Sequence, residues 1–434
     1  MSILIRDCTV VTANGEATPH CYVGISDKKI DYVGQTEPAA AYEQIVEGNG
    51  SIVMPGLCNS HTHVAMSLLR GYGEDMPLQS WLHDSIFPFE AHLTGEDVYA
   101  GSLLGIAEML ATGTTSFTDM YDFYDFTAKA VEESGIKANL GRGFTCFNPE
   151  KTFRELPVYT EIKRSLENFH GLDDGRILVD VSPHAEYTTR PDILHDAAEL
   201  AKRYHLQMHI HLSETKTEHL ECVARHGKTP AQVLADEGIL DVPCTAAHCV
   251  WLSDSDMELL GRHGTTVAHC PKSNLKLASG IARIEQMLQK GVRVAIGTDS
   301  NASNNRLDML EEMRTAALLA KGISRNPCVL PAGQVLHMAT KAGYEAQGRF
   351  DAGDIAVGMR ADLVMLSAQD ISMTPCHNAT ANILYAAHSG AVSMTMVDGR
   401  ILYRNGEFTT LDIEKIRYHA NACIDHIEKR RHQS

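Results

Sequence analysis

Short apolar runs alternate with amphipathic helical segments through the middle of the chain, and this alternation constrains the fold more than any other feature of the sequence. Parallel strands joined by helices give such a pattern, because each helix covers one face of the sheet. The runs fall at 51–59, 114–118, 138–144, 176–182, 207–211, 244–248, 265–269 and 292–299. Eight such units predict an α/β fold closed into a (β/α)8 barrel, the TIM barrel.

The two ends of the chain differ in composition from the middle. Residues 2–53 and 361–403 contain short β-rich segments separated by turn residues, and Asp398-Gly399 stands between two of them as expected for a hairpin. We therefore predict a small β-sandwich domain formed from both chain ends, residues 1–54 and 360–434, the second part ending in a helix. The barrel then occupies residues 55–359.

Charge and cysteine usage exclude several classes of protein. The net charge of −17 over 434 residues argues against nucleic acid or an anionic membrane surface as a partner, because both select basic faces. No apolar stretch approaches the roughly 20 residues of a membrane helix, and residues 1–7 do not resemble a signal peptide. The eleven cysteines lack C-x-x-C spacing, which predicts a reduced, cytoplasmic protein without a disulfide framework.

Histidines recur where the predicted strands end. Side chains two apart on a strand point to the same face, so His61 and His63 can bind one ion. The active site of such a barrel lies at the C-terminal strand ends, where the polar residues are His61, His63, His184, His209, His211, His248, His269 and Asp299. Any single histidine is more often structural than a ligand, but so many at one rim indicate a metal site. Spacing does not choose between His209 and His211, which face the same way.

Four motifs carry a resemblance to a known family. They are P-G-x-x-x-x-H-T-H at 55–63, H-L-S-E-T at 211–215, A-A-H-C at 246–249 and G-T-D-S-N-A-S-N-N at 297–305. Together they resemble the amidohydrolase superfamily and, within it, the 5-methylthioadenosine/S-adenosylhomocysteine deaminases. The similarity extends over essentially the whole chain. The motifs are highly specific for the superfamily and moderately specific for the substrate.

The resemblance implies one divalent metal per subunit, usually Zn²⁺ with Fe²⁺ as an alternative. Its implied ligands are His61, His63, His211 and Asp299. His209 then becomes a residue of the barrel interior. Relatives with two metals use a carboxylated lysine at the fourth strand end, but residues 181–185 contain no lysine, so a mononuclear site is expected.

The same resemblance implies a hydrolytic deamination at C6 of an adenine ring. A divalent ion lowers the pKa of its water from about 16 to about 7. Asp299 would hold that water and take its proton, while His248 would stabilise the hydroxide and the tetrahedral centre. Glu214 is the candidate acid that protonates the neighbouring ring nitrogen. The alternative for Glu214 is an ordinary carboxylate at the start of a surface helix.

Further residues are candidates for substrate binding. Trp81 and Glu90 match positions that contact the ribose in the resembling deaminases, although Trp81 could equally be a core aromatic side chain. His184 resembles a residue that contacts the purine or the sugar, and Ser303 lies in the loop after Asp299. A charged amino-acid tail would require a guanidinium clamp, for which Arg142 and Arg154 are candidates. The segment 142–160 does not match the family by motif.

Two other functions stay open at this point. Relatives with the same metal site act on triazines or on guanine-like purines, and a barrel of this kind could also serve as a non-catalytic scaffold. The presence of the metal ligands with Glu214 and His248 argues against the scaffold. The pair Trp81 and Glu90 favours a nucleoside, so a small-molecule nucleoside is the expected partner, in a protein expected to form a homo-oligomer.

Overall fold

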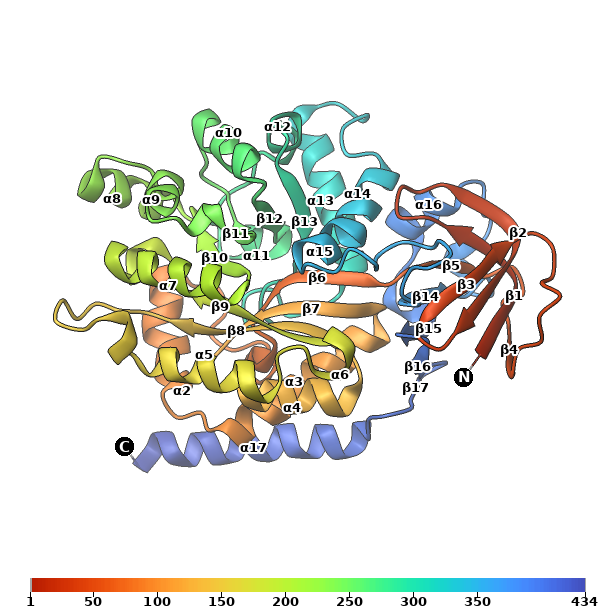
Figure 1. The fold of residues 1–434 in the computed structure, drawn as a ribbon, viewed down its shortest axis with the longest axis horizontal. Helices are drawn as coiled ribbons and strands as arrows, with labels where there is room; N and C mark the ends of the chain where they lie inside the picture. Colours follow the sequence, from red (N-terminus) through yellow and green to blue (C-terminus); the bar gives the residue numbers. More distant parts are fainter. Residues whose placement is uncertain (1, 434) are drawn as a thin grey trace.

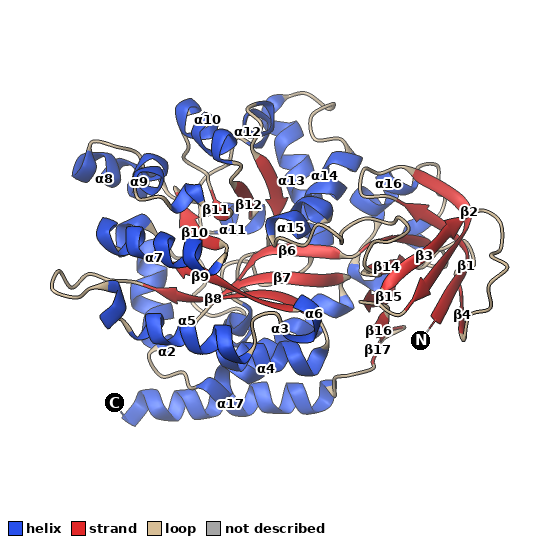
Figure 2. Ribbon diagram, in the orientation of Figure 1, coloured by secondary structure: helices blue, strands red, loops and turns tan. Residues whose placement is uncertain are grey.

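The barrel strands run parallel and neighbour one another in chain order. In residues 2–433, which the computed structural model describes, they form a sheet in the order β13-β12-β11-β10-β9-β8-β7-β6 (Figures 1 and 2). Their bounds are β6 Leu57–Thr62, β7 Thr114–Met120, β8 Lys137–Phe144, β9 Ile177–Pro183, β10 Met208–Leu212, β11 Cys244–His248, β12 Thr266–His269 and β13 Arg293–Ile296. Each apolar run of the alternating pattern contributes one of these strands, which confirms the predicted barrel.

Hydrogen bonds join the first and last barrel strands at the end that carries the predicted site. The backbone N–H of Asp299 donates to the carbonyl of His61 at 3.0 Å. Nδ2 of Asn59 donates to the Thr298 hydroxyl at 2.7 Å, and the Thr298 N–H donates back to Oδ1 of Asn59 at 3.0 Å. These bonds close the barrel and place residues from its first and last strands side by side.

Helices surround the barrel strands (Figure 2). They are α3 Gly95–Ala111, α4 Tyr124–Ser134, α5 Pro157–Asn168, α6 Leu172–Gly175, α7 Pro191–Tyr204, α8 Lys216–His226, α9 Pro230–Asp236, α10 Asp254–His263, α11 Pro271–Lys276, α12 Ile284–Gln289, α13 Met309–Ser324, α14 Ala332–Ala339 and α15 Lys341–Ala346. Thr94, Thr215, Thr229 and Ser253 each accept a backbone N–H at a helix start, as N-cap residues do. Apolar side chains between these helices and the strands form the main core.

Short helical turns fill the connections. They are η1 Val64–Leu69, α1 Leu78–Ser80, η2 Trp81–Ile86, α2 Phe87–Glu90, η3 Phe153–Glu155, η4 Glu186–Thr188, η5 Ile239–Asp241, η6 Ile371–Met373, α16 Ala379–Ala381, η7 Asn382–Ala386 and η8 Ser389–Ala391. The connection between η1 and α3 carries Trp81 and Glu90. Within residues 2–433, no helix combines the length and the apolar character that a membrane span requires.

A second, mixed sheet is built from both ends of the chain, at the right of Figure 1. Its strands are β1 Ser2–Val11, β2 Ala17–Ser26, β3 Lys29–Gly34, β4 Gln44–Glu47, β5 Ile52–Pro55, β14 Leu363–Leu366, β15 Val392–Val397, β16 Arg400–Arg404 and β17 Glu407–Phe408. The expected hairpin is confirmed, because β15 and β16 pair antiparallel across Asp398 and Gly399. Both turn residues have positive φ, 47° and 72°, as a two-residue hairpin turn requires.

The apolar run that leads to His61 belongs to both sheets, which corrects the expectation of one continuous strand. It divides at Gly56: β5 pairs with β1 and β14 in the second sheet, whereas β6 pairs with β7 in the barrel. The Gly56 N–H donates to the carbonyl of Asp362 at 2.8 Å. A Cβ at Gly56 would lie 2.0 Å from Oγ1 of Thr115, so only glycine lets the chain pass between the sheets here.

The C-terminal helix α17 (Ile413–Gln433) lies along the barrel helix α3, at the bottom of Figure 1. Nε of Arg430 donates to the carbonyl of His92 at 2.9 Å, and its guanidinium also pairs with Asp97 of α3. Ile427 is fully buried in a cluster with Trp81, Ile86 and Phe89. The division into residues 55–359 and the two chain ends stays a prediction, and α17 is the part of the C-terminal segment that contacts the barrel.

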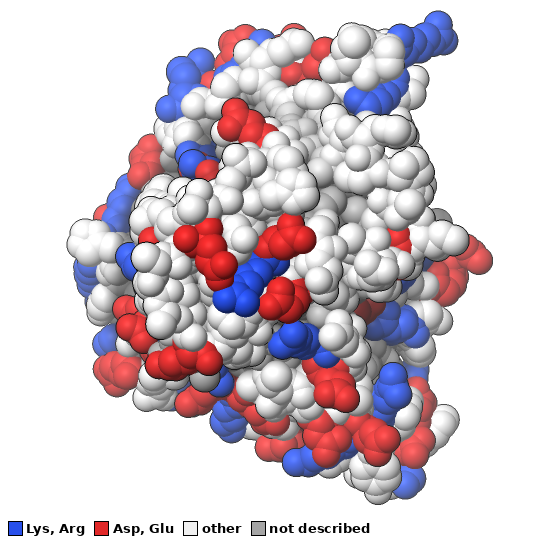
Figure 3. Space-filling model, turned by 90° about the vertical axis from the view of Figure 1, so that its right-hand side faces the viewer, with Lys and Arg blue, Asp and Glu red and all other residues white. Residues whose placement is uncertain are grey.

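Acidic and basic side chains are interspersed on the face formed by the second sheet. Figure 3 shows them as small groups of both signs separated by uncharged surface, without a continuous basic patch on that face. This distribution agrees with the excess of acidic residues in the sequence.

Candidate metal centre and active site

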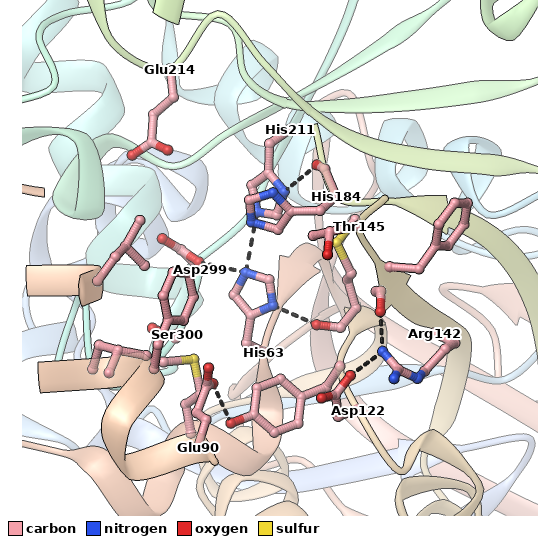
Figure 4. Close-up of a pocket in the computed structure, with 18 of the residues that line it drawn as sticks. His63, Glu90, Asp122, Arg142, Thr145, His184, His211, Glu214, Asp299 and Ser300 are labelled. Atoms are coloured by element: carbon pink, nitrogen blue, oxygen red, sulfur yellow. Dashed lines mark hydrogen bonds and ion pairs between the residues drawn. The ribbon is translucent and has the colours of Figure 1, made fainter. Parts of the chain in front are cut away.

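Three imidazoles and one carboxylate converge at the C-terminal ends of β6, β10 and β13. Nε2 of His63 lies 3.3 Å from Nε2 of His211. Oδ1 of Asp299 lies 3.4 Å from Nε2 of His61 and 3.4 Å from Nε2 of His63. Figure 4 shows His63, His211 and Asp299 pointing toward one another inside the cavity. The structure therefore brings together the four residues that the sequence predicted as metal ligands.

The second ring nitrogen of each predicted histidine ligand is held by a hydrogen bond. Nδ1 of His63 bonds to the carbonyl of Met120 at 2.5 Å, and Nδ1 of His211 to the carbonyl of His184 at 2.8 Å. Nδ1 of His61 lies 2.9 Å from Nε2 of His209. This arrangement leaves the Nε2 lone pair of each ring free for a metal, as in known metal-binding histidines. His209 thus takes the interior position that the family resemblance implies.

Whether a metal fits this site can be judged from the surroundings of the buried Nε2 of His61. Among the described residues this atom has no hydrogen-bond partner, although the ring is completely buried. A buried nitrogen without a partner is costly unless something binds it. His61, His63 and His211 offer nitrogen atoms within 4.8 Å of one another, and His61, His248 and Asp299 form a second set within the same limit. Nitrogen donors with one carboxylate are a suitable set for zinc.

The electrostatics keep these groups in the protonation states that a metal requires. Burial lowers the pKa of His61 to about 3 and that of His211 well below its usual value. Burial works to raise the pKa of Asp299, but its close contact with His61, together with His248 and His63, holds that pKa well below the usual range. His61 and His211 are therefore neutral and Asp299 is ionised near neutral pH.

Asp299 is fixed by its backbone and by two serines. Its φ of 61° turns the chain sharply after β13. Its Oδ2 accepts hydrogen bonds from Oγ of Ser273 at 2.6 Å and from Oγ of Ser303 at 2.7 Å, while Oδ1 faces the histidines. One oxygen is thus used for orientation and the other is available to the metal and its water.

His248 and Glu214 face each other beside this centre. Nε2 of His248 lies 3.9 Å from Oε2 of Glu214, and Nδ1 of His248 lies 2.9 Å from Oδ1 of Asn274. Burial works to lower the pKa of His248, but the charges of Glu214 and Asp299 and the bond to Asn274 outweigh it and raise the pKa. Oε1 of Glu214 accepts from Oγ of Ser279 at 3.1 Å. A carboxyl group and an imidazole, both of which can transfer protons, thus lie together beside the predicted metal centre.

A cavity of about 490 Å³ opens over the predicted centre. It is lined by the predicted residues Trp81, Glu90, Arg142, His184, Glu214 and His248, and also by His63, His211 and Asp299. This volume lies within the usual range for small-molecule sites, roughly 300–1,000 Å³. Apolar side chains such as Ile86, Phe87 and Leu156 form much of the remaining wall.

The structure places two predicted substrate residues away from the cavity wall. Arg154 is exposed in η3 and is not among the lining residues. Ser303 is buried behind Asp299, where its hydroxyl bonds to that carboxylate. Arg142 does line the cavity, but its guanidinium is paired with Asp122 and Glu161. Among the described side chains, neither candidate arginine therefore presents an unpaired guanidinium to the cavity.

Several supporting residues were not found from the sequence. The hydroxyl of Tyr121 donates to Oε1 of Glu90 at 2.6 Å. Glu218 accepts the backbone N–H groups of Ser213 and Glu214, both at 2.7 Å, and so fixes the turn that carries Glu214. The sequence signal for Glu218 was its capping box with Thr215, three positions earlier. Tyr121 carries no motif, and only the fold brings it beside Glu90.

Comparisons with known proteins define the class. A sequence profile of the amidohydrolase family matches residues 52–402. The chain is 44% identical over 393 residues to a 5-methylthioadenosine/S-adenosylhomocysteine deaminase of Dictyoglomus thermophilum, covering 90% of this chain and 91% of the relative. It is also 44% identical over 431 residues to a 5'-deoxyadenosine deaminase of Methanosarcina barkeri, covering 99% of both chains. The chain belongs to the amidohydrolase family.

A solved structure agrees with this placement. The fold superposes on a zinc-bound adenosine deaminase from Xanthomonas campestris with a TM-score of 0.93 and 32% sequence identity, over 98% of each chain. A triazine hydrolase from Arthrobacter aurescens has a TM-score of 0.92 at 23% identity, which shows a shared barrel fold. The relatives thus have the same barrel and the same arrangement of chain ends.

Proposed function

We propose that this protein is a hydrolytic deaminase of adenosine-type nucleosides, giving the inosine analogue and ammonia. The substrate class comprises 5-methylthioadenosine, S-adenosylhomocysteine, adenosine and 5'-deoxyadenosine. The observation that carries the proposal is the convergence of His61, His63, His211 and Asp299 beside the facing pair Glu214 and His248. The names of the similar deaminases support it.

His61, His63, His211 and Asp299 would hold a single Zn²⁺, with Fe²⁺ as the alternative. The unpartnered Nε2 of His61 supports this assignment. A divalent cation there supplies a nucleophile at neutral pH by making water more acidic. The end of β9 and the residue after it, Ser182-Pro183-His184, contain no lysine, which supports a mononuclear site.

The protein groups divide the proton transfers between them. Asp299 accepts the proton of the attacking water, because its carboxylate is ionised and held by Ser273 and Ser303. Glu214 protonates the ring nitrogen beside C6 and so makes that carbon electrophilic. His248, held by Asn274, stabilises the negative charge that develops as the C–O bond forms. The amino group takes up the proton held by Asp299 and leaves as ammonia. The proton of the new C6 hydroxyl returns to Glu214, which leaves the C6 carbonyl and the protonated ring nitrogen of the inosine analogue.

Residues on the cavity wall orient the rest of the nucleoside. Glu90 is placed to accept hydrogen bonds from the ribose hydroxyls, and Tyr121 fixes its carboxylate. Trp81 supplies apolar cover at the same wall. His184, whose ring centre lies 4.7 Å from that of His211, is placed to contact the purine or the sugar.

A substrate panel tests this function. Purified protein with zinc should shift the ultraviolet band of adenosine and methylthioadenosine to shorter wavelength as the amino group is lost. A chelator should abolish the reaction and added zinc should restore it. Turnover of a triazine or guanine panel without turnover of any adenosine would move the assignment to another amino-heterocycle. The absence of turnover on every panel, with metal bound, would indicate a scaffold.

The cellular setting is also a proposal. All eleven cysteines are free thiols in the structure, and most are buried. Free, buried thiols support a reducing compartment such as the cytoplasm. A homo-oligomer remains expected, and light scattering on the purified chain would determine the number of subunits.

A further inference from the structure

Three charged side chains meet at one wall of the cavity, and we name them the Arg142 cluster. Arg142 and Asp122 line the cavity, whereas Glu161 pairs with Arg142 without lining it. Arg142 lies on β8, Asp122 follows β7, and Glu161 lies on α5. The Arg142 guanidinium pairs with Oδ1 of Asp122, and its Nε lies 3.1 Å from Oε2 of Glu161. Figure 4 shows Arg142 and Asp122 on the opposite side of His63 from Glu214.

The position of the Arg142 cluster indicates which part of a bound nucleoside it would contact. The reacting amino group must lie near Glu214 and His248, because these residues act on the adenine ring in the proposed function. Arg142 and Asp122 lie across His63 from Glu214 (Figure 4), so the cluster faces the part of the substrate farthest from C6. In an adenosine-type nucleoside that part is the 5' substituent.

The charge of the Arg142 cluster is negative when its members are counted together. One guanidinium faces two carboxylates, so its net charge is −1. Arg142 is the one lysine or arginine among the described lining residues, whereas Glu90, Asp122, Glu214, Glu218 and Asp299 are acidic. The positive charge on this wall is therefore already neutralised before any substrate enters.

Building on the proposed function, we propose that Asp122 and Glu161 are specificity-determining residues that make the site select 5' substituents without a net negative charge over anionic ones. An anionic tail must displace a carboxylate from Arg142 or lie beside two like charges, and both cost binding energy. A neutral tail has neither penalty and can use the apolar side chains Phe123 and Val158 of the same cavity. Repulsion by the carboxylates of Asp122 and Glu161 therefore discriminates against anionic 5' substituents.

Two substrates that differ in charge but hardly in shape provide the test. They are 5'-thioadenosines that carry on sulfur either a 2-carboxyethyl group or the matching carboxamide. For the native enzyme we expect kcat/KM to be at least about tenfold higher for the carboxamide. In Asp122→Asn, in Glu161→Gln and in the double variant, the charge of the cluster becomes 0, 0 and +1. The ratio of carboxamide to carboxylate should fall at each step and reverse in the double variant.

A matched control separates this role from general effects of charge. Asp125 lies three residues from Asp122, pairs with Arg164 at 3.6 Å and does not line the cavity. Asp125→Asn should leave the substrate ratio unchanged. Because the Arg142 cluster is partly exposed, added salt should also reduce the native ratio, since the screening length falls from about 30 Å at ~0.01 M to about 3 Å at ~1 M.

The possible outcomes are distinct. A native enzyme that prefers the carboxylate, or variants that keep the native ratio, would overturn the role of Asp122 and Glu161 while the deaminase function stands. Equal shifts in Asp125→Asn would also overturn it. Failure to deaminate any 5'-neutral adenosine would refute the proposed function itself, and the inference would fall with it. Using a ratio of two substrates cancels any loss of folded enzyme in a variant.

Discussion

Nδ1 of His61 lies 2.9 Å from Nε2 of His209 in the centre of the barrel. Because Nε2 of His61 faces the predicted metal site, its Nδ1 must carry the proton and donate a hydrogen bond to His209. This bond fixes the tautomer of a predicted metal ligand. Such supporting partners commonly account for 10- to 100-fold in metal affinity.

Replacing His209 should therefore weaken metal binding although it is not a predicted ligand. We expect His209→Leu to lower zinc affinity by about 10- to 100-fold, measured by competition with a chromogenic chelator. His209→Gln should lose less zinc affinity, because its side-chain oxygen can still accept the hydrogen bond from Nδ1 of His61. Equal affinities in the native protein and the leucine variant would show that the bond does not orient His61.

Glu214→Gln should separate metal binding from turnover. The amide has nearly the same shape and can still bond to Ser279, but it cannot supply the proton, so kcat/KM should fall by about 10²- to 10⁴-fold. Metal content, measured by mass spectrometry, should stay native, whereas His211→Ala should lose the metal. Glu221→Gln, an exposed change on α8, the helix that follows Glu214, is the control. Metal loss in Glu214→Gln would contradict the assigned role.

Asp180 should make the stability of the barrel depend on pH. Both its oxygens accept from Nδ2 of Asn139, at 3.0 and 3.3 Å. Burial nevertheless raises its pKa to about 7, although the bond from Asn139 and the charge of Arg349 act to lower it. Between pH ~4 and pH ~7 the folded protein then binds more protons at this site than the unfolded chain, so its contribution to stability declines as pH rises.

Asp180→Asn should remove this contribution. The raised pKa corresponds to at most about 4 kcal/mol, so the fall in melting temperature between pH 5 and pH 8 should be smaller in the variant. Melting curves at several pH values measure it, with the exposed Asp196→Asn as the control. A pH profile that matches the native one would show that Asp180 is ionised in the folded protein throughout this range.

Replacing Ile427 in the C-terminal helix should weaken substrate binding. Its side chain is fully buried against Trp81, Ile86 and Phe89, which belong to the segment that forms the cavity wall. Ile427→Ala should cost about 2–5 kcal/mol of stability and raise KM more than it lowers kcat. Ile427→Val should cost about 0.5–1.5 kcal/mol. An unchanged KM in the alanine variant would show that α17 does not influence substrate binding.

The barrel could be predicted because it has a local signature, and candidate ligands could be named from strand spacing together with the family motifs. Alternating apolar runs and helices indicate the barrel, and the spacing of His61 and His63 places both on one strand face. The partners of these residues have no such signature. Tyr121 reaches Glu90, and Ser273 and Ser303 reach Asp299, through contacts between segments that are distant in the chain. Ser303 was predicted to bind substrate because its loop position does not reveal which way its hydroxyl points.

For Arg142, too, the sequence alone does not show which charged side chains lie beside it. The sequence supplies a basic residue in this segment, which made Arg142 a candidate clamp for a charged amino-acid tail. The fold brings Asp122 from the preceding strand end and Glu161 from the following helix against it. Whether a guanidinium is available to a ligand depends on its neighbours in space, and these belong to separate βα units.

The sequence by itself determined the element order, the hydrophobic pattern of the barrel and the chemistry of the residues at its rim, because these depend on side-chain type and short-range spacing. The tertiary structure decided which rim residues meet, which nitrogen of each histidine is free, and how the chain divides between two sheets at Gly56. These depend on barrel closure between β6 and β13, through which Asp299 comes to lie beside His61.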